Sequence, residues 1–490
     1  MNILVVAAEV APFAKVGGLA DMTGALPRAW RSDGHEVAIM LPLYGSIDIA
    51  AYGIVRTDLL VTVPVGYWSE YAEIWQGTLP GTDVPVYFLR SAEYFDRQGI
   101  YGYHEGFEDN DRRYLFFCRA AFEATKVLGF QPDVIHAHDY HTAPCMPMLA
   151  MQYRHDPFFA KTAGVLTIHN MAFQGIFDPL RAMEFGGFPP SEFYPSSWFE
   201  HHGSFNAMKS GIMFADKVTT VSPTYAQEIR WTSEGMGLQG ALQYRAADLI
   251  GVLNGIDASI WNPTTDEHIA VPYASSSLSK KIINKLALLR EVEMPSDEHA
   301  ARLPIIGMVT RLTQQKGIPI MMRSVWELLQ QRRARLVVLG SGVREYEDYF
   351  QRAQHQFPDL VRFVKGYNEP LSHRIQAGAD LYLMPSQFEP CGLTQMYAMA
   401  YGTVPIVRAT GGLADTVTQY DRSTGNGTGV RFFDYNDEAL AGALEDALAL
   451  YHDEHHWQRV QSNAMHEDNS ISVAARHYVE VFAWARERHC

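Results

Sequence analysis

Short runs of apolar, mostly β-branched residues alternate along this chain with stretches whose apolar residues recur at helical spacing. Such runs are typical of buried parallel strands, and the stretches between them predict amphipathic helices. The predicted strands form two series: Ile3–Ala7, Val37–Leu41, Val84–Leu89, Val134–Ala137, Gly164–Ile168 and Lys217–Val221, then Ile305–Thr310, Arg335–Leu339, Val361–Val364, Leu381–Met384 and Val404–Val407. The alternation predicts an α/β protein whose parallel sheets are covered by helices on both faces.

Two series of strands indicate two doubly wound domains. The length of 490 residues agrees, because a single hydrophobic core rarely grows beyond ~300 residues. The pattern becomes irregular after Asn254-Gly255-Ile256-Asp257, so we predict a first domain at residues 1–255 and a second at 256–471. The last amphipathic segment, about Val473–Arg488, follows the second series without a new strand, and its pattern fits either domain.

Net charge and composition restrict the classes of molecule that this protein is expected to bind. The formal net charge is −15 and no run rich in Lys or Arg stands out, which argues against nucleic acid, because phosphate binding needs a basic surface. No run of 18 apolar residues occurs and the apolar start lacks the basic residues of a signal peptide, so we expect no membrane partner. Four scattered cysteines indicate neither a disulfide framework nor a metal knuckle, so a cytoplasmic location fits best.

The loops that follow the strands carry the candidate chemistry, because open α/β sheets bind ligands outside the carboxyl ends of their strands. Glu9 ends the first strand, and Lys15 and Asp21 bracket the glycine pair Gly17-Gly18 just after it. Glycines let the backbone approach an anion, the next helix offers free N–H groups, and Lys15 adds positive charge. A tight turn between strand and helix explains the two glycines equally well.

Two motifs suggest a metal site and also have simpler readings. His136 and His138 alternate on one strand, so their side chains face the same way. Since no further ligands are evident, we favour polar residues that line a sugar site. Asp109 and Asp111 could hold a Mg²⁺–diphosphate, but they stand just before a helical run, where acidic residues serve as caps.

Loops of the second series also carry charged residues. Arg311 and Lys316 follow one strand and could stabilise a leaving diphosphate, since Arg grips phosphate with a planar fork and Lys supplies a compact charge. Glu389 follows another strand, just before Gly392 and a helix start, and a carboxylate there can accept hydrogen bonds from sugar hydroxyls. Arg311 and Lys316 could instead be two solvated surface cations. Cys391 could be read as a nucleophile because it is close to a helix N-terminus, but no neighbouring base is evident.

Taken together, these motifs resemble the bacterial glycogen synthases and plant starch synthases, glycosyltransferase family 5. They occur in the family's order over nearly the whole chain, which makes the set specific although each motif alone is weak. The matches are Lys15-Val16-Gly17-Gly18-Leu19, His136-Ala137-His138-Asp139, Ile168-His169-Asn170, Val221-Ser222-Pro223-Thr224-Tyr225-Ala226, Asn254-Gly255-Ile256-Asp257, Arg311 with Gln315-Lys316-Gly317, Phe388-Glu389-Pro390-Cys391-Gly392-Leu393-Thr394 and Thr410-Gly411-Gly412-Leu413-Ala414-Asp415-Thr416-Val417.

The resemblance implies the GT-B fold, in which two Rossmann-like domains face a deep interdomain cleft, with the final helix, 472–490, joined to the first domain. It also implies a donor site formed mainly by the second domain and an acceptor side in the first. The residues expected to act in catalysis are Lys15, His169, Arg311, Lys316 and Glu389. Donor contacts are expected at Gly17, Gly18, Asp21, Asn254, Cys391, Gly392, Leu393, Thr394 and Tyr397, and acceptor contacts at Glu9, Tyr103, Asp139 and Asn170.

The implied reaction moves glucose from ADP-glucose to the non-reducing end of an α-1,4-glucan or maltooligosaccharide, with retention of configuration and release of ADP. No metal or pyridoxal phosphate cofactor is expected. Three other functions stay open from the residues: a GT-B transferase that makes trehalose, sucrose or a glycolipid, a phosphorylase, and a catalytically silent glucan-binding protein.

A few positions depart from the family's usual pattern. Gln387 stands where Arg is common, Met399-Ala400 replaces a bulkier or basic pair, and 469–471 lacks a usual aromatic residue. Tyr397 takes the second position of a Glu-x7-Glu motif of related transferases, as is usual in this family. These departures remove no chemical group that the reaction needs, but they leave nucleotide preference and acceptor length open.

Overall fold

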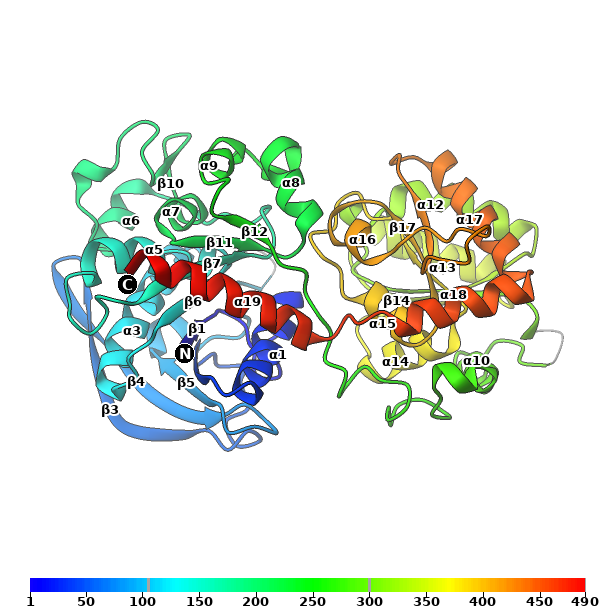
Figure 1. Ribbon diagram of the computed structural model, residues 1–490, viewed down its shortest axis with the longest axis horizontal. Coiled ribbons are helices and arrows are strands. Elements are labelled where there is room, and N and C mark those ends of the chain that lie inside the picture. The colour runs from blue at the N-terminus through cyan, green and yellow to red at the C-terminus, as the bar shows by residue number, and fades with distance from the viewer. Residues whose placement is uncertain (104–105, 298–300, 490) are drawn as a thin grey trace. The chain divides into compact units, whose positions relative to one another are not determined.

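The computed structural model describes residues 1–103, 106–297 and 301–489. The chain divides into two compact units, of which unit 1 comprises Met1–Asn254 with Ile471–Cys490 and unit 2 comprises Gly255–Ser470 (Figure 1). The chain therefore passes between the units twice, after Asn254 and after Ser470.

Unit 1 is built on a sheet whose strands follow the order β12-β11-β7-β6-β1-β2-β5-β4-β3. The strands are β1 (Asn2–Val6), β2 (Glu36–Pro42), β3 (Val55–Val65), β4 (Trp68–Thr78), β5 (Pro85–Arg90), β6 (Val134–His138), β7 (Ala163–Ile168), β11 (Lys217–Thr220) and β12 (Leu249–Gly251). The part from β11 to β5 is parallel, as predicted, and β12 adds a parallel strand that was not predicted, whereas β3 and β4 form an antiparallel hairpin against β5. The sequence analysis missed this hairpin, which has one largely exposed face.

Unit 2 is built on a fully parallel sheet with the order β15-β14-β13-β16-β17-β18. Its strands are β13 (Ile305–Val309), β14 (Arg335–Gly340), β15 (Val361–Lys365), β16 (Leu381–Met384), β17 (Val404–Arg408) and β18 (Val430–Phe432). Both sheets are doubly wound: the strand order reverses between β1 and β6 in unit 1 and between β13 and β16 in unit 2. Ligands of such sheets bind at these switch points.

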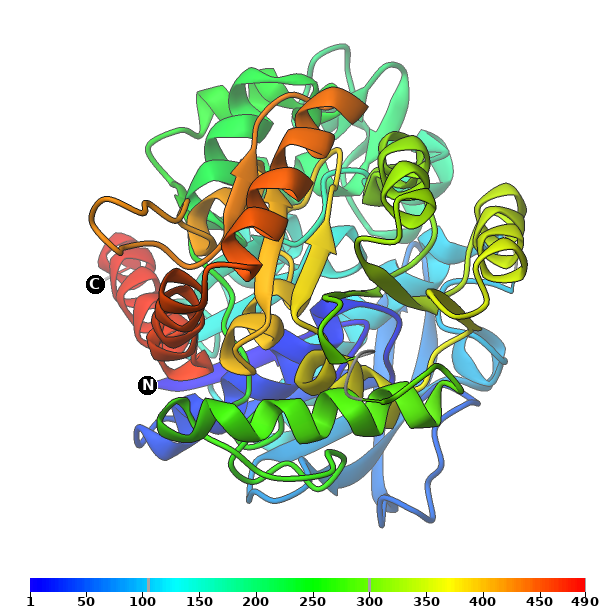
Figure 2. The ribbon, with the colours of Figure 1, turned by 90° about the vertical axis from the view of Figure 1, so that its right-hand side faces the viewer.

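Helices cover both faces of the unit 2 sheet (Figure 2). Ile305 contributes to the core beneath α10 (Lys281–Glu291) and α14 (Glu369–Gly378), whereas its neighbour Ile306 contributes to the core beneath α12 (Ile318–Gln330), α13 (Arg344–Gln356) and α17 (Asp437–Tyr451). Consecutive strand residues point to opposite faces, so a run with no polar position marks a strand that is buried on both sides.

The described residues form further α-helices in both units. In unit 1 they are α1 (Gly18–Ser32), α2 (Ala92–Phe95), α3 (Asn110–Leu128), α4 (Asp139–Thr142), α5 (Cys145–Met148), α6 (Pro179–Phe185), α7 (Ala207–Phe214), α8 (Pro223–Trp231), α9 (Gln239–Tyr244) and α19 (Ile471–Arg486). In unit 2 they are α15 (Thr394–Ala400), α16 (Gly411–Thr416) and α18 (Glu454–His466). A small antiparallel sheet of β8 (Ile176–Phe177), β10 (Ser204–Asn206) and β9 (Glu200–His201) completes unit 1.

The last helix, α19, packs on unit 1 beside α1 (Figure 1). The indole of Trp30 in α1 donates a hydrogen bond to the Ala475 carbonyl over 3.1 Å, and its ring packs against Tyr478 and Phe482 of α19. His136 of β6 lies under the same helix, with its ring 5.1 Å from that of Tyr478. Apolar and aromatic contacts therefore fix α19 along its length.

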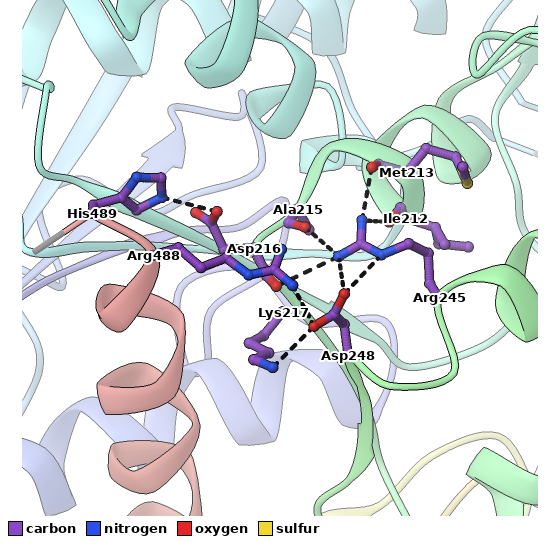
Figure 3. A network of polar contacts seen from close by, with 9 residues as sticks. All are labelled: Ile212, Met213, Ala215, Asp216, Lys217, Arg245, Asp248, Arg488 and His489. Carbon is purple, nitrogen blue, oxygen red and sulfur yellow. Dashed lines mark hydrogen bonds and ion pairs between the residues drawn. The ribbon is translucent and has the colours of Figure 1, made fainter.

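Ion pairs centred on Asp248 anchor the residues that follow α19 to the rest of unit 1 (Figure 3). The Asp248 carboxylate receives Lys217 Nζ at 2.9 Å, Arg245 Nη2 at 3.0 Å and Arg488 at 2.6 Å. Arg245 also donates to the carbonyls of Ile212, Met213 and Ala215, which end α7. One carboxylate thus joins β11, the segment before β12 and the residues just after α19.

Replacement of Asp248 by Asn should destabilise unit 1 by about 1–2 kcal/mol at pH 7, because three cations lose their common anion. Burial opposes ionisation of this carboxyl, but hydrogen bonds from Lys217 and Arg488 outweigh it and lower the pKa. The advantage of the native residue should be complete above the unfolded pKa of about 3.9 and shrink as the pH falls below it. Thermal unfolding at pH 7, 5 and 3 measures this.

The matched control is Asp83→Asn, which removes an exposed carboxylate paired with Arg31. Surface ion pairs contribute little, so its effect should be much smaller than that of Asp248→Asn. Equal losses from the two variants, or a loss that does not change with pH, would contradict the importance of the Asp248 pairs.

Candidate active site

In unit 1, the loop after β1 is organised around the buried carboxylate of Glu9. It accepts hydrogen bonds from the backbone N–H of Val16 at 2.5 Å and of Gly17 at 3.0 Å, and from the hydroxyl of Tyr101. Burial raises the pKa of Glu9, although these hydrogen bonds act in the opposite direction. Glu9 therefore stabilises the glycine turn through these hydrogen bonds. This structural role is additional to the predicted contact with the acceptor.

The predicted cation of this turn, Lys15, lies beside the predicted donor residue Asp21. Lys15 Nζ is 2.6 Å from Asp21 Oδ1, and both side chains are partly exposed. Gly17 is in the N-cap position of α1 in an extended conformation, and Gly18 is the first residue of that helix. The turn thus presents a backbone helix start and an ion pair at the carboxyl end of β1.

The loops after β6 and β7 meet at Asp139. Its Oδ1 accepts the backbone N–H of His169 at 2.6 Å and of Asn170 at 3.3 Å. Asp139 is buried and has a positive φ of 54°, a conformation that Asp and Asn adopt more readily than most residues. Burial raises the pKa of Asp139 to about 7 despite the two backbone hydrogen bonds, so this carboxyl titrates near neutral pH.

His169 is held by a second histidine. Its Nε2 lies 3.0 Å from Nδ1 of His138, and burial lowers the pKa of His169 to about 3. The imidazole is therefore neutral at pH 7. His136 lies deeper, fully buried with Nε2 2.6 Å from the Thr167 hydroxyl, so the prediction that it lines a sugar site is wrong: α19 covers it.

Tyr101 joins the two groups of unit 1, and the sequence analysis did not select it. Its hydroxyl donates to Glu9, and its ring stacks on His141, two residues after Asp139, with centroids 4.4 Å apart. The selected residue, Tyr103, is 70% exposed and packs edge-on against Phe107. The two tyrosines are separated by one glycine in sequence, so nothing in the sequence distinguished the partly buried one from the exposed one.

Two further predictions concern residues near the edges of this region. Asn254, the last residue of unit 1 before the crossing, is buried, and its Oδ1 has no hydrogen-bond partner within the described part of the chain. Asp109 stands at the N-cap position of α3 but makes no capping hydrogen bond; it pairs with Arg97 instead, which corrects the prediction. Asp111 pairs with Arg181.

In unit 2, the switch point between β13 and β16 carries a partly buried ion pair. Lys316 Nζ, from the loop after β13, is 2.5 Å from Glu389 Oε2, in the loop after β16. The Ser386 hydroxyl donates to the same oxygen at 3.0 Å. The backbone supports this pair, because the N–H of Gln387 donates to the Gln315 carbonyl at 2.8 Å. Arg311 is exposed in the same loop as Lys316.

Two glycines allow the loops of this site to touch. Gly317 has a φ of 76°, and a Cβ on it would lie 1.9 Å from the Pro385 carbonyl oxygen. Gly411 has a φ of 45°, and a Cβ on it would lie 1.9 Å from the carbonyl oxygen of Glu389. No side chain fits such distances, so both positions require glycine for the loops after β13, β16 and β17 to converge.

The predicted donor residues after Glu389 form the turn that leads into α15. Gly392 has a φ of 74°, Leu393 is the N-cap residue and Thr394 begins the helix. The side-chain amide of Gln395 donates to the carbonyls of Cys391 and Gly392, at 3.2 and 3.0 Å. Cys391 is buried, which disfavours its reading as an exposed nucleophile. Tyr397 is also buried and stacks on Trp261.

Outside these loops, the described part of the chain offers a cavity, but neither a metal-binding cluster nor a membrane-spanning helix. Among the described residues, no three His, Cys, Asp or Glu side chains gather closely enough to hold a metal ion. None of the helices within 1–103, 106–297 and 301–489 has the length and apolarity needed to cross a membrane. A pocket of about 440 Å³ beside Trp198, Lys209 and Tyr244 in unit 1 is lined by residues outside the predicted site.

Comparisons with known proteins agree with this architecture. Residues 2–244 match a family model described as the starch synthase catalytic domain, and residues 290–464 match one described as glycosyl transferases group 1. Sucrose-phosphate synthase from Thermosynechococcus elongatus has the same fold, with a TM-score of 0.61 at 16% identity and 98% coverage of each chain. Two doubly wound units with polar switch-point loops define a glycosyltransferase of the GT-B fold.

Proteins that match the full length of this chain identify its family more specifically. The catalytic domain of starch synthase IV from Arabidopsis thaliana, bound to ADP and acarbose, has a TM-score of 0.91 at 35% identity, with 99% of each chain covered. Glycogen synthase 2 of Geobacter sulfurreducens is 42% identical over 488 residues, 99% of each chain, and glycogen synthase of Bacillus subtilis is 42% identical over 482 residues, 98% of each. The chain belongs to the glycogen synthase and starch synthase family, as the motifs indicated, and is a glycosyltransferase that transfers glucosyl units to an α-glucan.

The raised pKa of Asp139 predicts a pH-dependent stability that Asp139→Asn removes. Asn keeps an Oδ1 acceptor for the His169 N–H and tolerates the positive φ. In the native protein the unfolded chain ionises near pH 3.9 and the folded one near 7, so stability falls across this window. Relative to the variant, the native protein should lose up to about 4 kcal/mol between pH 4 and pH 7.

Thermal or urea unfolding of both proteins at pH 4.5, 6 and 7.5 measures this difference. A difference between the two proteins that stays constant over the range would show that Asp139 is ionised in the folded state throughout.

Proposed function

We propose that this enzyme transfers glucose from ADP-glucose to the non-reducing end of an α-1,4-glucan, with retention of configuration and release of ADP. The structurally similar starch synthase domain was solved with ADP and acarbose, an oligosaccharide analogue, which supports a nucleotide and a glucan as ligands. The observation that carries the proposal is the Lys316–Glu389 pair at the switch point of unit 2, where a doubly wound sheet binds its ligand.

Unit 2 is suited to the donor because its two cations lie in one loop after β13. An ammonium has three donors, so Lys316 can hold Glu389 and a phosphate oxygen at the same time. Arg311 offers a planar fork to the second phosphate. Glu389, held by Lys316 and Ser386, can accept hydrogen bonds from glucose hydroxyls. As the bond to glucose breaks, the cations would stabilise the negative charge that develops on the diphosphate.

Unit 1 supplies groups suited to a positively charged sugar and its acceptor. Burial keeps His169 neutral, so it can hydrogen-bond near the anomeric carbon without opposing an oxocarbenium-like charge. One oxygen of each carboxyl, Glu9 Oε2 and Asp139 Oδ1, accepts hydrogen bonds from two backbone N–H groups. This occupation disfavours either carboxylate as a nucleophile and supports attack by the acceptor on the face that the diphosphate leaves, which retains configuration. Lys15 and the glycine turn would complete the contacts to the donor.

We further propose that Arg311 and Lys316, rather than a metal ion, take up the leaving charge, so that the reaction needs no cofactor. The assay that tests the whole proposal measures nucleotide release from ADP-glucose and from UDP-glucose, each with and without glycogen, before and after EDTA treatment. Release from ADP-glucose that requires glycogen and survives EDTA is expected. NMR of the elongated maltooligosaccharide should show a new α-linkage.

Other results would point elsewhere. A preference for UDP-glucose would overturn the assignment of the donor, and transfer to glucose or a lipid rather than glycogen would overturn that of the acceptor. Glycogen binding without any nucleotide release would indicate a silent glucan-binding protein.

The variant Lys316→Ala should lower kcat about 10²–10³-fold, because it removes a preorganised charge stabiliser from the site of the leaving group. Glu389→Ala should lose a similar factor, since it removes the partner that positions Lys316. Steady-state kinetics with ADP-glucose and glycogen measure both, and circular dichroism checks that the variants are folded.

Arg323→Ala is the matched control, because this cation lies on α12, the next helix after the Lys316 loop, and its side chain is 75% exposed. It should retain kcat within about twofold. Near-native turnover in Lys316→Ala and Glu389→Ala would remove the basis of the proposal.

A further inference from the structure

Three aromatic rings form a parallel stack in unit 2, with Trp261 in the middle. The indole lies 3.8 Å from the ring of Tyr397, at an interplanar angle of 8°, and 3.8 Å from the ring of His373, at 9°. His373 and Tyr397 are buried, and they belong to two different helices, α14 and α15. Trp261 therefore bridges these helices through its two faces.

A buried carboxylate fixes the far end of this stack. Asp266 Oδ2 lies 2.8 Å from His373 Nδ1 and accepts a hydrogen bond from the Tyr401 hydroxyl at 2.5 Å, and its Oδ1 accepts the backbone N–H of His268 at 2.8 Å. The Tyr273 hydroxyl donates to the Tyr401 carbonyl at 2.7 Å. These bonds hold His373 in one orientation and tie the end of α15 to the segment that carries Trp261 and Asp266.

The middle ring of the stack, Trp261, belongs to the segment by which the chain enters unit 2. The backbone N–H of Ile256 donates to the Asn469 carbonyl at 2.8 Å, so the entering segment pairs with the leaving one. The N–H of Trp261 donates to the Asp257 carbonyl at 2.9 Å. Four residues thus separate the first paired position, Ile256, from Trp261, and this stretch is hydrogen-bonded at both ends.

Tyr397 connects the stack to the proposed donor site. It lies in α15, three residues after Thr394, and α15 follows directly on the turn from Glu389 to Leu393. The direction of the Tyr397 ring is set by the indole against it, and a shift of this ring would move the first turn of α15. The stack therefore joins the crossing segment to the turn that carries the donor residues.

We propose that Trp261 is a positioning residue for the nucleotide sugar: it holds Tyr397 and the first turn of α15 in the geometry that binds the donor, and it fastens that turn to the crossing segment. This inference rests on the proposed function, because it takes unit 2 as the donor site.

The test compares Trp261→Leu with Trp326→Leu. Both indoles are partly buried in unit 2, but Trp326 lies on α12 and its ring contacts are with Tyr349 and Phe357. With ADP-glucose as donor and glycogen in excess, Trp261→Leu should raise the donor KM about tenfold and lower kcat less, because binding geometry is lost before chemistry. The affinity for ADP, measured by calorimetry, should fall by a similar factor. Trp326→Leu should leave both values within about twofold.

Three more variants, namely Trp261→Phe, Tyr397→Leu and the double variant, show whether Trp261 acts through its ring and through Tyr397. Trp261→Phe keeps a ring that can stack and should restore the donor KM to within about threefold of the native value. In a Tyr397→Leu background, Trp261→Leu should raise the donor KM little further, since two residues that act as a unit are not additive. An equal rise in donor KM for Trp261→Leu and Trp326→Leu, or full additivity with Tyr397→Leu, would overturn the inference.

Nucleotide release by the native enzyme distinguishes a failure of this inference from a failure of the proposed function. If native protein releases no nucleotide from ADP-glucose, the proposed function fails, and the five variants are compared by calorimetry with ADP and UDP. If native protein is active and Trp261→Leu matches Trp326→Leu in every constant, the inference alone fails.

Discussion

A parallel sheet brings the carboxyl ends of its strands to one edge, and the candidate site depends on this constraint. Glu9, Asp139 and His169 are far apart in sequence, yet they follow β1, β6 and β7, which are neighbours in the unit 1 sheet. Lys316 and Glu389 follow β13 and β16, which are neighbours in unit 2. In both units the polar loops meet where the strand order reverses, so the winding of the sheets determines which residues can cooperate.

The two units stabilise a carboxylate that follows a strand in different ways. A carboxylate after a strand must be held by donors if it is buried. Glu9 and Asp139 are held by backbone N–H groups, and burial raises the pKa of both. Glu389 is held by the ammonium of Lys316, which supplies a full charge. The buried carboxylates of unit 1 are therefore paired with neutral donors, whereas the carboxylate of unit 2 is paired with a cation.

The sequence was most informative where strands are buried on both faces. The run Leu381–Met384 forms β16 with the predicted limits, and the last predicted helix overlaps α19 by most of its length. The hairpin of β3 and β4 was missed because a half-exposed strand mixes polar and apolar positions, and β12 and β18 because three residues give too short a pattern. The pairing of Lys316 with Glu389 links positions 73 residues apart, which local patterns do not reveal. Tyr101 and Tyr103 differ only in burial, and burial is a property of the fold.

The placement of α19 has a consequence for synthesis of the chain. Unit 2 is continuous in sequence, but unit 1 needs residues 471–489 to cover Trp30 and His136. During translation, the surface of unit 1 that includes Trp30 and His136 stays uncovered until α19 is made. More than two hundred residues of unit 2 are synthesised before that. At about 5–20 residues per second, that delay lasts on the order of ten seconds or more. Nascent unit 1 is then a natural client for chaperones that shield apolar surface, and the unit that begins first is completed last.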